Sequence, residues 1–296
     1  MSNSIVMGVD IGGSHITAAL VDLDTRKVIQ HSWIRKSVDS HEDASRIISS
    51  WGEAIKKAFS ALEFEITKVG IGMPGPFDYE NGICFIKDQD KYESLYGLNI
   101  KELLAEALEV NPDKIRLMND AACFLQGEAF GGAAKGFSKI IGLTLGTGLG
   151  SSIYSQNTAV DANFWNLPFK DSIAEDYLST RWFIKRYREL SGKVVTDVKY
   201  LAKLAISDND ALTVFNEFGT NLGAFLNEFI ELEKPEAIVL GGNISNAFNL
   251  FEKALRSSIN TNFQHIPIFQ AKLGEEAALI GASSLWYFSS FETVSD

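Results

Sequence analysis

The chain has 296 residues, of which 46% are hydrophobic, and it carries a formal net charge of −11 at pH 7. This composition is that of a globular protein with one large or two smaller domains, and the acidic balance argues against a nucleic-acid partner, which needs a basic surface. The start of the chain lacks the basic head and long apolar run of a secretory signal, and the uncharged stretch 140–160 is too polar to span a membrane, so we expect a cytoplasmic protein with no membrane partner.

The first forty residues are predicted to form three successive strands joined by tight turns. Val6–Asp10, Ile16–Asp22 and Val28–Arg35 are rich in β-forming residues, and paired glycines and the stretch DTRK separate them. Apolar residues then recur at helical spacing over 42–62. The next predicted elements are a strand in TKVGIGMPGPFD, a helix near Lys101–Leu108, a strand at Ile115–Met118 and a helix from about Ala121 to Phe130. This order predicts a mixed sheet with helices packed on it.

The same pattern restarts near residue 140. Aligning VMGVDIGGSH with IIGLTLGTGL places Asp10 over Thr144 and Gly12 over Gly146. The second half continues with helix-rich sequence over 172–233, then a strand in EAIVLGG, a helix after Asn246, a strand near IPIFQA and a helix from about Glu275. No low-complexity linker separates the halves, so we expect two packed lobes with a cleft between them.

Two glycine turns, in GVDIGGSH and LTLGTGLG, interrupt otherwise apolar strands. A tight hairpin is one interpretation of each, and a turn whose bare N–H groups bind phosphate is the other. Asp10, at the end of the first strand, suits a hydrated Mg²⁺, which keeps several waters and needs only one or two carboxylates. Neither turn matches a Walker loop or completes the dinucleotide-binding GxGxxG.

Asn119 and Asp120 stand between a predicted strand and a predicted helix. Helix capping is one interpretation of the pair, because both residue types are preferred caps. The other makes Asp120 a general base at the carboxyl end of a strand, where open α/β sheets bind ligands. In IVLGGNIS, paired glycines likewise allow either a plain strand–helix turn or a surface for a flat ring.

Five motifs in this order resemble the ROK family of sugar kinases and repressors: VDIGGSHITAALVD, GIGMPGPFD, MNDAACFLQGEAFGGAAKG, LTLGTGLGSSI and IVLGGNIS. That family belongs to the sugar kinase–actin–heat-shock-70 superfamily of two-lobed ATPases. The resemblance implies an α/β fold of two ribonuclease-H-like lobes, with mixed sheets flanked by helices and a cleft between them. The expected lobes are residues 1–118, joined by a C-terminal helix at about 280–296, and residues 119–279.

The resemblance also implies roles for individual residues. Asp120 is the implied catalytic base, and Asp10 is the implied Mg²⁺ ligand, acting through water. The implied ligands of ATP and its phosphates are Asp10, Gly12, Gly13, Ser14, His15, Gly146, Thr147, Gly148, Gly241 and Gly242. The implied sugar contacts are Gly75, Asn119, Asp120, Asn163, Asn166 and Glu175.

The chain departs from the family after the second glycine turn. ROK proteins commonly carry a Gly-Glu-x-x-His segment there, followed by a zinc-binding cysteine cluster, whereas this chain reads DANFWNLPFKDSIAEDYLS. Asn163 replaces the sugar-binding Glu, Asn166 replaces the zinc-ligand His, and no cysteine follows Cys123, so we expect no structural zinc. Glu175 matches a sugar-contacting Glu of the family, and a solvated first-turn helix residue is its alternative interpretation.

These features favour an ATP-dependent kinase of a hexose or hexose derivative, similar to glucokinases, fructokinases or N-acetylhexosamine kinases, with sugar, ATP and Mg²⁺ as ligands and a homodimer as the assembly. A degenerate, non-catalytic sugar- or nucleotide-binding protein is the first rival, because the zinc segment is missing. A sugar-responsive repressor is the second, and it is disfavoured because the first strand begins within a few residues of Met1 and leaves no room for a helix-turn-helix.

Overall fold

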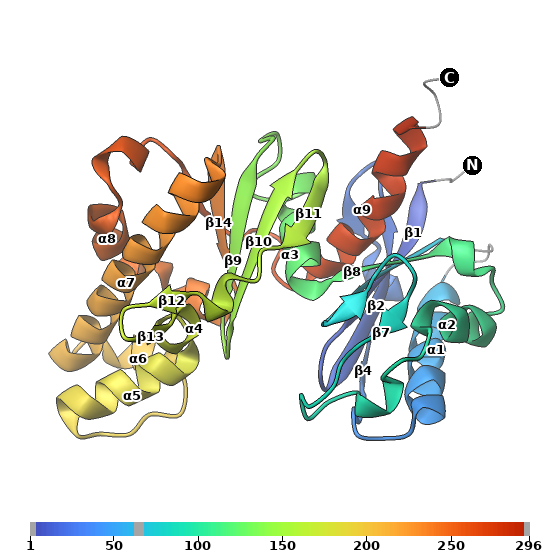
Figure 1. Ribbon diagram of the computed structural model, residues 1–296, viewed down its shortest axis with the longest axis horizontal. Coiled ribbons are helices and arrows are strands. Elements are labelled where there is room, and N and C mark those ends of the chain that lie inside the picture. The colour runs from blue at the N-terminus through green and yellow to red at the C-terminus, as the bar shows by residue number, and fades with distance from the viewer. Residues whose placement is uncertain (1–3, 62–67, 293–296) are drawn as a thin grey trace. The chain divides into compact units, whose positions relative to one another are not determined.

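The computed structural model describes residues 4–61 and 68–292 (Figure 1). The chain divides into two compact units, and each is described here by itself. The first unit comprises Met1–Lys135, Asn157–Ala159 and Glu275–Asp296. The second unit comprises Gly136–Gln156 and Val160–Gly274.

The first unit is built around a mixed sheet with the strand order β3-β2-β1-β5-β8, and β4 also pairs with β2. Strands β1, β5 and β8 are parallel, and β2 is antiparallel to β1. The strands are β1 (Ile5–Ile11), β2 (His15–Asp22), β3 (Lys27–Val28), β4 (Ile34–Ser37), β5 (Val69–Met73) and β8 (Ile115–Asn119), and a small hairpin is formed by β6 (Phe77–Asp78) and β7 (Ile83–Cys84). The helices of this unit are α1 (Ala44–Phe59), α2 (Ile100–Leu108), α3 (Asp120–Phe130) and α9 (Glu276–Glu292).

Two kinds of helix packing hold this sheet. Helix α1 is capped by Asp43, whose carboxylate accepts a hydrogen bond from the Arg46 N–H. The helix buries an apolar stripe that includes Trp51 against the sheet. Helix α9 instead approaches the strands at backbone distance. A Cβ atom at Gly8 would lie 2.5 Å from the Leu279 carbonyl oxygen, and one at Gly70 would lie 2.1 Å from that of Ala282. Only glycine permits this close packing.

A second mixed sheet repeats the arrangement with the strand order β11-β10-β9-β14-β15. It belongs to the second unit, except that the first two residues of β11 are counted in the first unit. Strand β10 is antiparallel to β9, and β14 is parallel to both β9 and β15. The strands are β9 (Ile140–Leu145), β10 (Leu149–Ser155), β11 (Thr158–Asp161), β14 (Ala237–Gly241) and β15 (Ile268–Gln270), with a separate hairpin of β12 (Pro168–Phe169) and β13 (Ser172–Ile173). The helices are α4 (Ala174–Tyr177), α5 (Thr180–Ser191), α6 (Val198–Leu204), α7 (Asn209–Glu233) and α8 (Phe248–Ser258). Aromatic rings fill the core between α5, α7 and α8, among them Phe183, Phe218 and Phe251.

The α/β class and the mixed sheets flanked by helices are confirmed, but the predicted strand Val28–Arg35 is wrong as a single element. A 3₁₀ turn at Gln30–Ser32 divides it, because the Ser32 hydroxyl donates to the Ile29 carbonyl and accepts from the Leu20 N–H. The predicted helix 42–62 ends at Phe59, and Leu62 lies outside the described residues. The two-residue strands of the two small hairpins were not predicted, because they are too short to show an alternating pattern.

The compact units also divide the chain differently from the expected lobes. Residues 119–135 belong to the first unit, because α3 packs along α9, whereas the sequence placed them in the second lobe. A Cβ at Gly127 of α3 would lie 2.0 Å from the Ala277 carbonyl oxygen, which shows how closely these helices pack. A division by contacts need not coincide with an evolutionary one, so the expected lobe boundaries stay a prediction.

Candidate active site

The first glycine turn connects β1 to β2, and hydrogen bonds to Gly12 fix its conformation. The Gly12 N–H donates to the His15 carbonyl at 2.9 Å, and the buried Tyr92 hydroxyl donates to the Gly12 carbonyl at 2.5 Å. Within the described chain, the backbone N–H groups of Gly13 and Ser14 make no hydrogen bond, and both residues are exposed. Free, outward amides of this kind form an anion-binding turn.

The second glycine turn connects β9 to β10 and is built on the same plan. The Gly146 N–H donates to the Gly148 carbonyl at 3.0 Å, and Thr180 donates to the Gly146 carbonyl from both its N–H (2.8 Å) and its hydroxyl (2.9 Å). Among the described residues, the N–H groups of Thr147 and Gly148 have no hydrogen-bond acceptor. Both turns are therefore hairpins, as one interpretation held. Both also leave amides without an acceptor, and the binding of phosphate by these amides stays a prediction.

The two turns differ in length by one residue. Ile11 pairs with Ile16 in the first hairpin, and Leu145 pairs with Leu149 in the second. The repeat seen in the sequence is thus a repeat of topology. Beyond the turn, equivalent residues of the two hairpins are offset by one position.

The glycine pair Gly241–Gly242, at the end of β14, lies beside the second turn. Gly241 pairs with Thr144, and Gly242 has a φ of 82°. A Cβ at Gly242 would lie 2.4 Å from the Leu145 carbonyl oxygen, immediately before the turn. The sequence LGGN therefore packs backbone against backbone at the carboxyl end of β9, which only glycine allows.

Asp10 and Asp120 act on each other electrostatically in the first unit. Burial, and then the charge of Asp120, raise the pKa of Asp10 to about 6, while the Arg35 guanidinium opposes the shift. Asp10 is the penultimate residue of β1, and Asp120 begins α3 directly after β8. Two carboxylates that repel each other at a strand edge suit a hydrated divalent cation, because its charge would relieve the repulsion.

The structure separates the cap of α3 from the candidate base. Asn119 is the N-cap, since its side-chain oxygen accepts from the Ala122 N–H at 3.1 Å. Its amide nitrogen donates to the Tyr79 hydroxyl at 3.3 Å, and a Cβ at Gly75 would lie 2.9 Å from that hydroxyl. Gly75 and Asn119 therefore both lie against the Tyr79 hydroxyl, and Asp120 is not the capping residue.

Arg35 and Glu275 are site neighbours that the sequence did not reveal. An ion pair of 2.9 Å joins their side chains, and a second guanidinium nitrogen of Arg35 lies 3.1 Å from Nε2 of His15. Burial, and then Arg35, lower the pKa of His15. Pairing of β2 with β4 brings Arg35 opposite Thr17, so only the sheet register could have indicated this contact.

Glu175 lies against the second glycine turn. One carboxylate oxygen accepts from the Leu149 N–H at 3.1 Å, and the other forms an ion pair of 2.7 Å with Arg181. A Cβ at Gly148 would lie 2.6 Å from the first of these oxygens. Glu175 is thus bound into the turn and is not a solvated helix residue.

Asn163 and Asn166 lie in an exposed 3₁₀ turn. Asn163 has a φ of 59°, and its side-chain oxygen accepts from the Trp165 indole N–H at 2.9 Å. Among the described residues, no hydrogen bond connects either asparagine to Glu175. Their sugar contacts stay a prediction.

Replacing Asp10 with Asn should stabilise the ligand-free protein at neutral pH. A carboxyl whose folded-state pKa (about 6) exceeds its ordinary value of 3.8 binds protons more tightly in the folded state, so its ionisation removes stability as the pH rises from about 4 to about 6. The loss is about 2–3 kcal/mol. We expect Asp10→Asn to raise the Tm by about 5–10 °C at pH 7.5 and to leave it unchanged at pH 4, measured by calorimetry. Asp24→Asn, in an exposed turn, is the control, and equal Tm values for wild type and Asp10→Asn at pH 7.5 would contradict the burial of a charged Asp10.

The described residues contain no cluster of metal ligands and no membrane-spanning helix. In the ranges 4–61 and 68–292, no three His, Cys, Asp or Glu side chains gather as metal ligands, and Cys84 and Cys123 are buried free thiols. Over the same ranges, no helix is long and apolar enough to cross a membrane. The expected absence of structural zinc stays a prediction.

The repeated strand–glycine turn–strand unit, set in two mixed sheets with flanking helices, defines the class of this protein as the actin-like ATPase fold. A model of the ROK family matches residues 6–162 and 171–288, and the chain belongs to that family. The unmatched residues 163–170 include both Asn163 and Asn166, where the sequence departs from the family pattern.

Similar proteins include several sugar kinases. The chain is 24% identical over 298 residues to an N-acetylgalactosamine kinase of Shewanella sp. (strain ANA-3), covering 93% of each chain. It is 25% identical over 312 residues to an N-acetyl-D-glucosamine kinase of Mannheimia succiniciproducens, covering 95% of this chain and 99% of the relative. The crystal structure of a ROK hexokinase from Thermus thermophilus matches with a TM-score of 0.79 and 22% identity, covering 97% of this chain and 99% of that one. This last similarity supports the fold.

Proposed function

We propose that this protein is a kinase that transfers the γ-phosphoryl group of ATP to a hydroxyl of a hexose or hexose derivative. The observation that carries the proposal is the pair of glycine turns, each with its carbonyl held by a distant hydroxyl and its amides free. Membership of the ROK family supports the same activity. A cytoplasmic homodimer completes the proposal, and sedimentation analysis tests the assembly.

The chain's own residues would act mainly by positioning and electrostatics, as is usual in phosphoryl transfer. Asp120 takes the proton from the attacking hydroxyl, and Asn119, tied to the helix and to Tyr79, orients the sugar beside it. The amides of Gly13 and Thr147, with their neighbours in each turn, hold phosphate oxygens. When bound, Mg²⁺ neutralises charge on the phosphates of ATP, and Asp10 is the residue that would hold it through water.

The identity of the sugar is the finer part of the proposal. The relatives named above act on N-acetylated hexosamines, whereas the structural neighbour is a hexokinase. The segment around Asn163, which replaces a family Glu, is where this chain would read the sugar differently. Hydroxyls near the anomeric end are the groups that these substitutions would affect.

An ADP-release assay with a panel of hexoses, N-acetylated hexosamines and their C2 epimers tests the proposal. We expect sugar-dependent ADP release with one or a few members of the panel. Binding of sugar or nucleotide without turnover for any member would favour the rival, a non-catalytic binding protein.

Glu175→Gln should separate sugar binding from nucleotide binding. The amide retains an oxygen that can accept from the Leu149 N–H, so the turn keeps its support, but the negative charge toward the sugar is lost. We expect the KM for the sugar to rise about tenfold, the usual effect of losing one charged hydrogen bond, with the KM for ATP nearly unchanged. Glu106→Gln, an exposed glutamate on α2, is the control. If neither KM moves, Glu175 serves only to support the turn.

A further inference from the structure

The second unit contains a polar pocket of about 760 Å³ that is separate from the residues discussed above as nucleotide ligands. It lies among the β12–β13 hairpin, α4, α5 and α7. Residues of α7 line it at helical spacing, with Glu217, Thr220 and Asn221 on one stripe. A pocket of this size accommodates a small metabolite.

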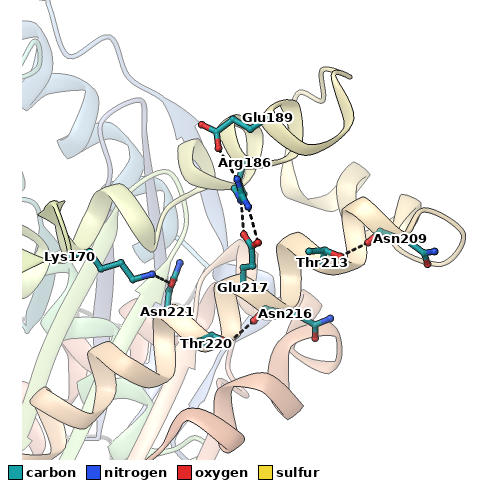
Figure 2. A network of polar contacts seen from close by, with 9 residues as sticks. All are labelled: Lys170, Arg186, Glu189, Asn209, Thr213, Asn216, Glu217, Thr220 and Asn221. Carbon is teal, nitrogen blue, oxygen red and sulfur yellow. Dashed lines mark hydrogen bonds and ion pairs between the residues drawn. The ribbon is translucent and has the colours of Figure 1, made fainter.

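Two cross-connections brace the pocket (Figure 2). Arg186 of α5 reaches Glu217 of α7 through two hydrogen bonds, of 2.6 and 2.9 Å, and also binds Glu189. Lys170, in the turn of the β12–β13 hairpin, donates to the buried side chain of Asn221 at 2.5 Å. A bidentate pair and a buried amide hold the walls in place without a ligand.

The remaining charged groups of the pocket include both cations and anions, and they can form further hydrogen bonds. Lys185 is exposed and has no hydrogen-bond or ion-pair partner among the described residues. The Tyr177 hydroxyl lowers the pKa of Asp171, and the charges of Lys185 and Lys170 lower it further, so both ammonium groups act on one region of the pocket. Asp176 accepts from the Ser172 hydroxyl and keeps further lone pairs.

From this chemistry we propose that the pocket binds a sugar phosphate, with the phosphate on Lys185 and Lys170 and the hydroxyls on the two aspartates. A bare anion would face the carboxylates of Asp171 and Asp176 unfavourably, whereas sugar hydroxyls use them as acceptors. A phosphate would complement the charges of the Lys185 and Lys170 ammonium groups, which a neutral sugar would not do. The hexose part of the ligand rests on the proposed function, and the phosphate part rests on the pocket.

The pocket is connected to the second glycine turn. Arg181 lines the pocket and pairs with Glu175, whose other oxygen supports the Leu149 N–H. A phosphate that competes for Arg181 would weaken the ion pair between Arg181 and Glu175. Ligand binding in the pocket is therefore expected to weaken the support that Glu175 gives to the second glycine turn. The ligand class matches the product of the proposed reaction, which makes this a site for feedback.

Calorimetric titration of the full chain with glucose 6-phosphate, without nucleotide, tests the site. The catalytic site can also bind this product, so the quantity to compare is the number of binding sites. We expect wild type to have one more site than Lys185→Gln, or the second site of the variant to bind at least tenfold more weakly. Lys185 has no partner in the described chain, so the variant should fold normally. Lys199→Gln, an exposed lysine on α6 outside the pocket, should match wild type.

Three outcomes would overturn the proposal. They are an unchanged site number and affinity in Lys185→Gln, equally tight binding of inorganic phosphate, and equally tight Lys185-independent binding of free glucose at the second site. The titration requires no turnover. A protein with no kinase activity but a Lys185-dependent site would therefore disprove the proposed function and leave this site standing.

Discussion

Asp120→Asn should lower kcat by about 10²–10⁴ while the Tm hardly changes, because the substitution removes a positioned proton acceptor and keeps the side chain's size. In the structure the cap of α3 is Asn119, so the capping bond does not depend on Asp120. The Asp120 carboxylate accepts from the Ala121 N–H at 2.9 Å, and the side-chain oxygen of Asn can accept the same bond. Steady-state kinetics and calorimetry on the same preparation give both quantities.

Two controls make this result interpretable. Asp24→Asn, in an exposed turn of the same unit, should have wild-type kcat and Tm. Asn119→Ala should lower the Tm, because it removes the N-cap at a cost of about 1 kcal/mol. If Asp120→Asn kept full activity and only lowered the Tm, Asp120 would be a structural residue and the proposed mechanism would be wrong.

Gly148→Val should raise the KM for ATP by at least about 10²-fold, since a branched side chain would occupy the space in which the turn amides meet phosphate. The structure adds a second reason. A Cβ at Gly148 would lie 2.6 Å from the Glu175 carboxylate, so the substitution would also displace the group that supports Leu149. Binding of the sugar alone, followed by calorimetry, should persist but weaken to about the level of Glu175→Gln, because the displaced carboxylate is the proposed sugar contact.

Gly146→Ala distinguishes these two reasons. A Cβ at Gly146 would meet no described atom within 4 Å, so the alanine itself fits the protein. If phosphate approaches the turn backbone, Gly146→Ala and Gly148→Ala should both raise the KM for ATP, whereas displacement of Glu175 would affect Gly148→Ala alone. A wild-type KM in both variants would show that neither glycine is needed for the approach of a phosphate.

The sequence alone determined the α/β class, the repeated strand–glycine turn–strand unit and the family. These are local properties: β-forming runs, glycines at turns and apolar residues at helical spacing each depend on neighbours close along the chain. The break of the strand predicted at Val28–Arg35 was the main local error, because the Ser32 hydroxyl competes with the sheet for backbone hydrogen bonds.

Only the tertiary structure decided how the candidate site is supported. The Tyr92 hydroxyl binds the Gly12 carbonyl across 80 residues of sequence, and Thr180 binds the Gly146 carbonyl across 34. Arg181 and Leu149 meet the two oxygens of one carboxylate, that of Glu175. Contacts of this kind depend on sheet register and side-chain direction in three dimensions, and no local periodicity encodes them.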